Sequence, residues 1–424
     1  MYQKVILDNG LRIILAPKEG TSASSMIVLI RNGFEYESKE LTGISHFLEH
    51  MFHKGTEKRP IAKEISKAIE GKGGIFNAFT SEEVVSYIVK ITASRLEVAI
   101  DVLSDILLNS QLKSEDIEKE KKVIIEEINM ENDDAVEMLE SLWISLLYKN
   151  TPAAGPILGT KTSIRGITRK KLQDYIKTYY RSQNIVVSIA GNIDVQKIPA
   201  VVEKCFSGIE RGEAPDKPRI RVIQRRPEVL LHYKETEQTH FLFGARIPNY
   251  TLFSPQRYAI KLLNVILGGN MSSRLFVKVR EEMGAAYDVS SDMDLMTDRG
   301  HMFVSAGTDN QKAEEAIKAI LEEYKDVAGR GISPEELEDA KEYKIGTLTL
   351  GFEDSLFWAS FFGEQELFLN RFLTPEEEME NYKKLKIEDV NEVAREIFRP
   401  ENLNLAIIGL HKNKEKFKRI LEEF

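Results

Sequence analysis

Apolar residues are arranged in two different patterns along the chain, short continuous runs and helical repeats. The runs "SMIVLIRNG" and "HFLFGARI" have the length and composition of buried strands, whereas "RLEVAIDVLSDILLNS" and "PQRYAIKLLNVILGG" repeat apolar residues at helical spacing. Both kinds of segment occur in each half of the chain. The pattern therefore predicts an α+β fold in which helices pack on one face of a mixed β-sheet.

Two distant segments align without a gap, which indicates an internal duplication. Residues Ile167–Ile193 and Leu385–His411 match at a constant offset of 218, so that Asn184 corresponds to Asn402. Each segment predicts an amphipathic helix, a polar turn and a buried strand that ends at glycine. Only two copies are found, so we expect two related domains and not a solenoid.

The length of the chain also favours two domains, because 424 residues exceed what one ordinary core accommodates. The segment "RGEAPDKPRIRVIQRRP" holds three prolines and many charges, as is typical of an exposed linker. We therefore predict an N-terminal domain at 1–213, a linker at 214–228 and a C-terminal domain at 229–424.

Composition narrows the class of protein. With 42% hydrophobic and 29% charged residues, and no apolar run long enough for a bilayer, we expect a soluble protein that does not insert into membranes. The first residues lack the pattern of a signal peptide, and a single cysteine, Cys205, excludes an intramolecular disulfide, so we expect a cytoplasmic protein. The net charge of -9 argues against general nucleic-acid binding and favours cationic partners.

The stretch "HFLEH" carries candidate metal chemistry. In a helix, His46 and His50 are one turn apart on one face, and Glu49 lies beside them. Two imidazoles can then hold zinc, which lowers the pKa of a water molecule to about 7, while the carboxylate of Glu49 takes a proton from that water.

The motif alone does not decide between a metal site and an ordinary helix turn, because a catalytic zinc usually needs a third protein ligand. His53 follows where the helix should end, and we interpret it as a surface residue or a neighbour of the site. The remaining histidines are isolated in the sequence. A carboxylate from the acidic helix "SEDIEKEKKVIIEEINMENDDAVEMLE" is the better candidate.

Several motifs together resemble one protein family. "HFLEH" followed by "KGT", then "GGIFNAFTSEE", then "EKEKKVIIEEI" is similar to the pitrilysin/insulysin family of zinc peptidases with an inverted motif. The similarity is greatest to its two-domain branch, which includes mitochondrial processing peptidase. It covers essentially the whole chain, and it implies a zinc endopeptidase with one Zn²⁺ per chain.

The resemblance also implies particular roles for residues of the acidic helix. Glu127 aligns with the third zinc ligand of the family, and the adjacent Glu126 is the alternative, since only one of the two can face the metal. Glu120 lies two turns earlier on the same face and matches a carboxylate that supports the site. A solvated helix charge is the competing interpretation of Glu120.

The second half lacks the metal motif. At the offset of 218, His46, Glu49 and His50 correspond to Asn264, Leu267 and Gly268. By resemblance, Arg280 and Tyr287 of this half hold the substrate and polarise the scissile carbonyl.

The resemblance further implies how substrates and partners bind. "GGIFNAFT" matches the edge strand that receives the peptide, which makes Asn77, Ala78 and Phe79 substrate-binding candidates. Two-domain members pair to close a chamber for short or unfolded peptides, so we expect a homodimer. The acidic run 126–140 would favour basic peptides if it lines that chamber, but a solvated helix explains it equally well. The alternative function is a non-catalytic or partner-dependent subunit of the same family.

Overall fold

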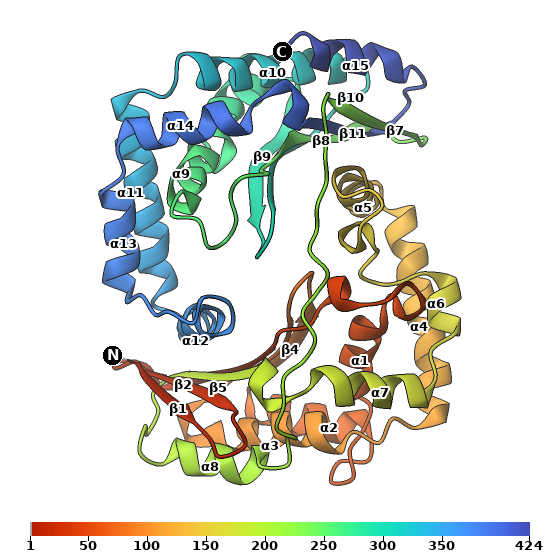
Figure 1. The fold of residues 1–424 in the computed structure, drawn as a ribbon, viewed down its shortest axis with the longest axis vertical. Coiled ribbons are helices and arrows are strands. Elements are labelled where there is room, and N and C mark those ends of the chain that lie inside the picture. Colours follow the sequence, from red (N-terminus) through yellow and green to blue (C-terminus); the bar gives the residue numbers. More distant parts are fainter. Residues whose placement is uncertain (1) are drawn as a thin grey trace. The chain divides into compact units, whose positions relative to one another are not determined.

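The computed structural model describes residues 2–424 and divides into two compact units (Figure 1). The first unit comprises residues up to Asn129, Gly155–Pro218 and Thr349–Thr374. The second unit comprises Met130–Ala154, Arg219–Leu348 and Pro375–Phe424. Each unit contains one mixed sheet with helices packed against it, which confirms the predicted fold class.

The sheet of the first unit has six strands in the order β1-β2-β6-β3-β5-β4. Only β2 and β6 pair in parallel, and the other neighbours are antiparallel. The strands are β1 Gln3–Ile6, β2 Arg12–Pro17, β3 Ala23–Ile30, β4 Ile75–Thr80, β5 Val85–Thr92 and β6 Ile185–Gly191. This order leaves β4 at one edge of the sheet, where its outer backbone groups have no neighbouring strand of the sheet.

Most helices of the first unit share one core with one face of this sheet. Ile13 and Leu15 of β2 point into that core, which also contains Phe47, Leu103 and Leu172 from three different helices. The helices are α1 Ile44–Phe52, α2 Ala62–Ile69, α3 Leu96–Asn109, α4 Ser114–Asp133, α6 Lys161–Arg165, α7 Arg169–Tyr179 and α8 Ile198–Phe206. Their shared core fixes α1 and α4, which carry the metal-site candidates, in one compact unit.

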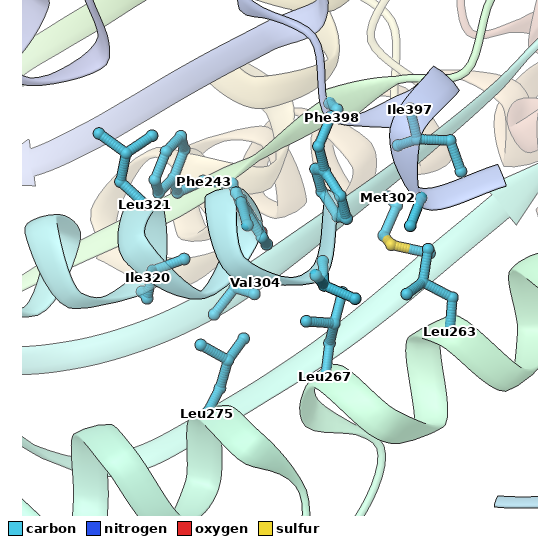
Figure 2. Packing of buried hydrophobic residues seen from close by; sticks show 14 of the residues in the cluster. Phe243, Leu263, Leu267, Leu275, Met302, Val304, Ile320, Leu321, Ile397 and Phe398 are labelled. Carbon is cyan, nitrogen blue, oxygen red and sulfur yellow. The ribbon is translucent and has the colours of Figure 1, made fainter. Parts of the chain in front are cut away.

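The second unit has a five-stranded sheet in the order β7-β11-β8-β10-β9. Its strands are β7 Glu228–Tyr233, β8 Gln238–Arg246, β9 Ala286–Leu295, β10 Gly300–Asp309 and β11 Leu403–Gly409. Its helices are α5 Ala135–Leu147, α9 Arg257–Gly268, α10 Ala313–Gly329, α11 Pro334–Gly351, α13 Pro375–Lys383, α14 Ile387–Ile397 and α15 Lys414–Glu422. Figure 2 shows Phe243, Val304, Leu263 and Ile320 meeting between the sheet and these helices.

One helix also covers the opposite face of each sheet, and this was not predicted. In the first unit, Ile14 and Leu29 pack against Ala359 and Phe362 of α12 (Ser355–Glu364). In the second unit, Trp143 of α5 belongs to a separate cluster with strands β8 and β11. Successive residues of the central strands point to opposite faces of the sheet, and both sets are apolar. Both faces of each sheet must therefore be buried by helices.

These two helices make the units discontinuous in sequence, unlike the contiguous domains predicted at 1–213 and 229–424. Residues 130–154, with α5, belong to the second unit, and residues 349–374, with α12, belong to the first. Local patterns predict which residues form a helix, but they do not show which sheet the helix will cover. The boundary between the units at Pro218 and Arg219 does fall inside the predicted linker 214–228.

The duplication is confirmed element by element. Helix α7, the turn Ser182–Asn184 and strand β6 have the same bounds as α14, the turn Pro400–Asn402 and β11 after the offset of 218. Asn184 donates its side-chain N–H to the carbonyl of Tyr179, and Asn402 donates in the same way to Ile397. The repeat therefore preserves a hydrogen bond as well as a sequence pattern.

The predicted linker is extended, but it is not entirely exposed. The side chain of Lys217 is only 6% exposed, and its Nζ lies 2.6 Å from carboxylate oxygens of both Glu35 and Glu83, all within the first unit. Ile220 is buried in the second unit. No helix within residues 2–424 is long and apolar enough to cross a membrane.

The close packing of α12 on the first sheet can be tested at Gly363. A Cβ atom there would lie 2.7 Å from Leu29 Cδ1 and 2.9 Å from Ser188 Cβ. We expect Gly363→Ala to lower the melting temperature, because overpacking of about 1–3 kcal/mol outweighs the gain in helix propensity. The control is Gly346→Ala in α11, where no atom lies within 4 Å and the substitution should be neutral or stabilising. Equal stability gains in both variants would contradict this packing.

Candidate metal centre

Helix α1 places two imidazoles next to each other. Its apolar residues Phe47, Leu48 and Met51 are buried in the core of the first unit. His46 and His50 lie one turn apart on another face, and their Nε2 atoms are 3.2 Å from each other. The packing of the apolar face therefore fixes the direction in which both rings point.

Helix α4 brings a carboxylate to the same point. Glu127 Oε2 lies 3.9 Å from His46 Nε2 and 3.7 Å from His50 Nε2. The alternative ligand, Glu126, is exposed and accepts a hydrogen bond from Asn129. The structure thus brings together the three predicted ligands His46, His50 and Glu127, and it directs Glu126 elsewhere.

The geometry of these three atoms fits a metal ion. Tetrahedral zinc with bonds of about 2.0–2.1 Å separates its ligand atoms by roughly 3.3 Å, close to the spacing observed here. Glu127 Oε2 is buried and has no hydrogen-bond partner within the described part of the chain. A buried carboxylate oxygen without a donor is costly, and a cation at this point would remove that cost.

Glu120 forms a hydrogen bond with the ring nitrogen of His50 that faces away from the cluster. Its Oε1 lies 2.7 Å from His50 Nδ1, and its Oε2 lies 2.5 Å from Lys54 Nζ. Burial raises the pKa of Glu120, but the hydrogen bonds from His50 and Lys54 lower it more, so the net shift is downward. The ionised carboxylate then accepts the Nδ1 proton of His50 and leaves the Nε2 lone pair directed at the site.

The two histidines differ in their electrostatics. Burial, together with the neighbouring His50, lowers the pKa of His46 to about 3, which keeps this imidazole neutral. Burial also lowers the pKa of His50, but its hydrogen bond to Glu120 and the charge of Glu127 raise it more. A neutral imidazole is the form that binds a metal, so protons compete with the ion chiefly at His50.

Glu49 is positioned as a base beside the cluster. Thr80, the last residue of β4, donates its hydroxyl to Glu49 Oε2 over 2.6 Å. Burial raises the pKa of Glu49, and the hydrogen bond from Thr80 opposes this shift. A raised pKa brings a carboxylate nearer to the range in which it accepts and returns protons at neutral pH. His53 lies outside the cluster, with Nδ1 2.8 Å from the carbonyl of Glu49.

The predicted substrate strand is the edge strand β4. It pairs only with β5, and Asn77 and Phe79 are exposed while Ala78 is partly buried. Its contact with Glu49 through Thr80 places this edge next to the metal cluster. The location suits strand addition, but binding of a peptide there remains a prediction.

Sequence reasoning missed Glu37, which anchors the start of α1. Gly43, the N-cap residue of α1, has no side chain to accept the first N–H groups of the helix. Glu37 accepts them instead, with Oε2 2.7 Å from Gly43 N and Oε1 2.8 Å from Ser45 N. Burial raises the pKa of Glu37 to about 8, and these hydrogen bonds act in the opposite direction. Only the missing capping side chain at Gly43 could have signalled such a partner.

The second unit carries the predicted arginine and tyrosine. The guanidinium of Arg280 lies 4.9 Å from the centre of the Tyr287 ring and 4.8 Å from that of Phe276. Tyr287 is 80% exposed at the start of β9, so its hydroxyl is available to a ligand. The two residues form a stacked pair, and their role toward substrate remains a prediction.

The position that corresponds to His50 is closed in the second unit. A Cβ atom on Gly268 would lie 2.6 Å from the backbone nitrogen of Ser291 in β9. Asn264, which corresponds to His46, donates to the carbonyl of Ser291 over 3.2 Å. Helix α9 thus uses this face to pack against β9, which agrees with the absence of the metal motif from the second half.

Comparison with known proteins identifies relatives of the whole chain. Residues 12–161 match the family model described as Insulinase (Peptidase family M16), and residues 166–344 match the one described as Peptidase M16 inactive domain. An uncharacterised zinc protease of Bacillus subtilis is 35% identical over 412 residues, which cover 96% of this chain and 98% of that protein. An uncharacterised zinc protease of Mycobacterium leprae is 32% identical over 421 residues, covering 99% and 94%.

A solved structure shows the same fold. The crystal structure of a protease from Helicobacter pylori superposes with a TM-score of 0.90 at 22% identity, covering 96% of this chain and 99% of that one. At this level of identity the similarity supports the two-unit architecture alone.

Removal of the Glu37 carboxylate should destabilise α1. We expect Glu37→Ala to lower the free energy of unfolding by about 2 kcal/mol, because two buried N–H groups lose their acceptor. Glu37→Gln keeps one acceptor oxygen and should lose less. Denaturant unfolding measures both effects, with Glu40→Ala, an exposed residue of the same loop, as the control. Glu37→Ala and Glu40→Ala of equal stability would contradict the capping role.

The support given by Glu120 should be visible in metal affinity. We expect Glu120→Ala to weaken zinc binding by about 10- to 100-fold, because His50 loses the partner that fixes its tautomer and orientation. Competition with a chromogenic chelator measures the dissociation constant. Glu118→Ala on the same helix removes only an exposed pair with Lys121 and should leave the affinity unchanged. The same affinity in all three proteins would refute a supporting role.

Proposed function

Because the chain belongs to peptidase family M16, we propose that it is a zinc-dependent endopeptidase that hydrolyses short or unfolded peptides. The observation that carries the proposal is that His46, His50 and Glu127 cluster together, and that the buried Oε2 of Glu127 has no hydrogen-bond donor among residues 2–424. Family membership agrees with the resemblance found in the sequence. The names of the relatives indicate zinc, and the ligand set in this chain suits that ion.

Each residue of the first unit has a distinct task in this proposal. His46, His50 and Glu127 would hold one zinc ion, which supplies Lewis acidity toward a carbonyl oxygen and lowers the pKa of water. Glu49 takes the proton of the attacking water and later passes it to the leaving amine. Thr80 keeps one oxygen of Glu49 occupied over 2.6 Å, so the other oxygen is free to accept that proton.

Substrate binding in the proposal uses backbone pairing. An extended peptide adds to the free edge of β4, alongside Asn77, Ala78 and Phe79, so its backbone is aligned beside Glu49. Backbone pairing tolerates many sequences but requires an unfolded segment, which accounts for the preference for short or unfolded peptides. Arg280 and Tyr287 are proposed to donate to the carbonyl oxygen as negative charge develops on it.

Assembly and location complete the proposal. We propose that two copies of the chain form a homodimer that encloses the peptide, and that basic peptides are preferred because of the net charge of -9. The single cysteine suits a reducing compartment such as the cytoplasm. The competing function is a subunit that is inactive alone or needs a different partner chain.

A comparison of Glu49→Gln with the wild type tests the activity directly. The substrate is a basic, unstructured quenched-fluorescence peptide, and both proteins are loaded with zinc. We expect the wild type to cleave the peptide and Glu49→Gln to be slower by roughly 100- to 10,000-fold, because the base is lost while the ligands remain. Zinc content, measured on the same samples, should be one ion per chain in both proteins.

Variants of the two adjacent glutamates serve as matched controls. Glu126→Gln should leave cleavage and zinc content unchanged, whereas Glu127→Gln should reduce both, because only Glu127 faces the histidines. Failure of the wild type to cleave although it holds zinc would overturn the autonomous peptidase. That outcome would favour a partner-dependent or non-catalytic subunit.

A further inference from the structure

A cavity of about 430 Å³ lies within the second unit, apart from the predicted substrate pair Arg280 and Tyr287. Its walls come from the end of strand β8, the turn between β9 and β10, the end of helix α5 and the extended segment 219–222. The volume is within the range of about 300–1,000 Å³ that is typical of small-molecule pockets.

The charged residues in the wall are mostly arginines. Arg219, Arg221, Arg246 and Arg299 line the cavity, and Asp298 is the one acidic residue among the lining residues. This concentration of positive charge contrasts with the net charge of -9 of the whole chain. The local field therefore favours an anion where the average charge of the protein disfavours one.

Arg246 is buried although its hydrogen bonds go to neutral acceptors. Its side chain donates from Nε to Gln224 Oε1 over 3.0 Å and from Nη1 to the carbonyl of Val222 over 3.0 Å, and only 6% of the residue is exposed. Across residues 2–424, no carboxylate oxygen lies within ion-pair distance of this guanidinium. A buried charge without a counter-ion is unfavourable, and a bound anion would offset that cost.

Arg299 presents a second buried guanidinium, held in a defined orientation. It stacks over the ring of Tyr148 at 4.6 Å, and its Nη1 lies 3.1 Å from Asp298 Oδ1. Asp298 also accepts the backbone N–H of Ile220 through Oδ2 over 2.8 Å. Asp298 therefore connects Arg299 to the extended segment at Ile220 and fixes this part of the cavity wall.

Arg219 and Arg221 differ from the buried pair because both are exposed. Anchoring of the extended segment explains the hydrogen bonds of Arg246 to Val222 and Gln224, but it does not explain why these two arginines border the same cavity. Neither makes an ion pair within the described residues. Their side chains are free to close over a ligand, as guanidinium groups do around phosphate and carboxylate.

We propose that this cavity is a binding site for a small molecule that carries a phosphate or carboxylate group. Arg246 and Arg299 form the fixed, buried part of the site, and Arg219 and Arg221 supply mobile charge at its mouth. The guanidinium fork matches both kinds of oxyanion in a bidentate manner, so either group satisfies the chemistry. The proposal depends on the second unit alone and is independent of the proposed peptidase activity.

Isothermal titration calorimetry of the full zinc-loaded chain tests the site. Inorganic phosphate and succinate serve as separate probes at constant ionic strength, and they distinguish a phosphate ligand from a carboxylate ligand. We expect saturable binding of at least one probe, weakened by roughly tenfold or more in the double variant Arg219→Gln/Arg221→Gln, because charge-assisted hydrogen bonds are lost. Both arginines are exposed, so the variant should fold as the wild type does.

The chain offers a matched control for this variant. Arg225→Gln/Arg226→Gln removes the same charge from the same extended segment, but neither residue lines the cavity, and both are exposed. Its affinity should equal that of the wild type within about twofold, since removal of distant exposed charges is largely screened by salt. Equal weakening in both double variants, equal affinity in all three proteins, or no saturable binding of either probe would overturn the proposal. If phosphate bound to the zinc ion and not to the cavity, the wild type and both double variants would bind it with equal affinity.

Discussion

The chemistry of the first unit depends on how helix α1 is rotated against the core. Phe47, Leu48 and Met51 are almost completely buried, so their packing leaves only one orientation for the helix. That orientation turns His46 and His50 toward α4, where Glu127 completes the cluster. Since each residue advances about 100° around a helix, a shift by one position would disperse the ligands. Hydrophobic packing thus fixes the positions of the three candidate metal ligands.

The sequence predicted best those features that are local to one element. His46 and His50 lie side by side because residues four apart always do so in a helix, and the duplication was visible because its offset survives in both copies. The selection of Glu127 over Glu126 came from the family resemblance. The structure gives the physical reason: Ile124 and Ile128 bury one face of α4, and this rotation leaves Glu126 outside.

Features that depend on long-range packing were not predictable in this way. Glu37 looks like any surface glutamate in the sequence, yet it is buried under the start of α1. Helix α12 packs on the first sheet and α5 packs on the second. Which helix packs on which sheet depends on the apolar sheet faces that the other helices leave exposed. Periodicity shows that a helix has an apolar face, but it does not identify the surface that covers it.

The two units share one architecture but differ at the positions that correspond to the candidate metal ligands. In the first unit, α1 contacts the edge strand β4 through Glu49 and Thr80, and its face toward α4 carries His46 and His50 beside Glu127. In the second unit, the corresponding face of α9 carries Gly268 and packs directly on β9. The arginine-lined cavity lies elsewhere in that unit, at the end of β8. The second unit lacks the candidate metal ligands, but it contains buried charge in Arg246 and Arg299.

Anomalous diffraction at the zinc edge from crystals of the zinc-loaded protein tests the central claim most directly. The account predicts a single strong peak per chain at about 2.0–2.2 Å from His46 Nε2, His50 Nε2 and a carboxylate oxygen of Glu127. A peak held by other residues, or no peak between α1 and α4 in crystals that contain zinc, would contradict the metal centre and the function that rests on it.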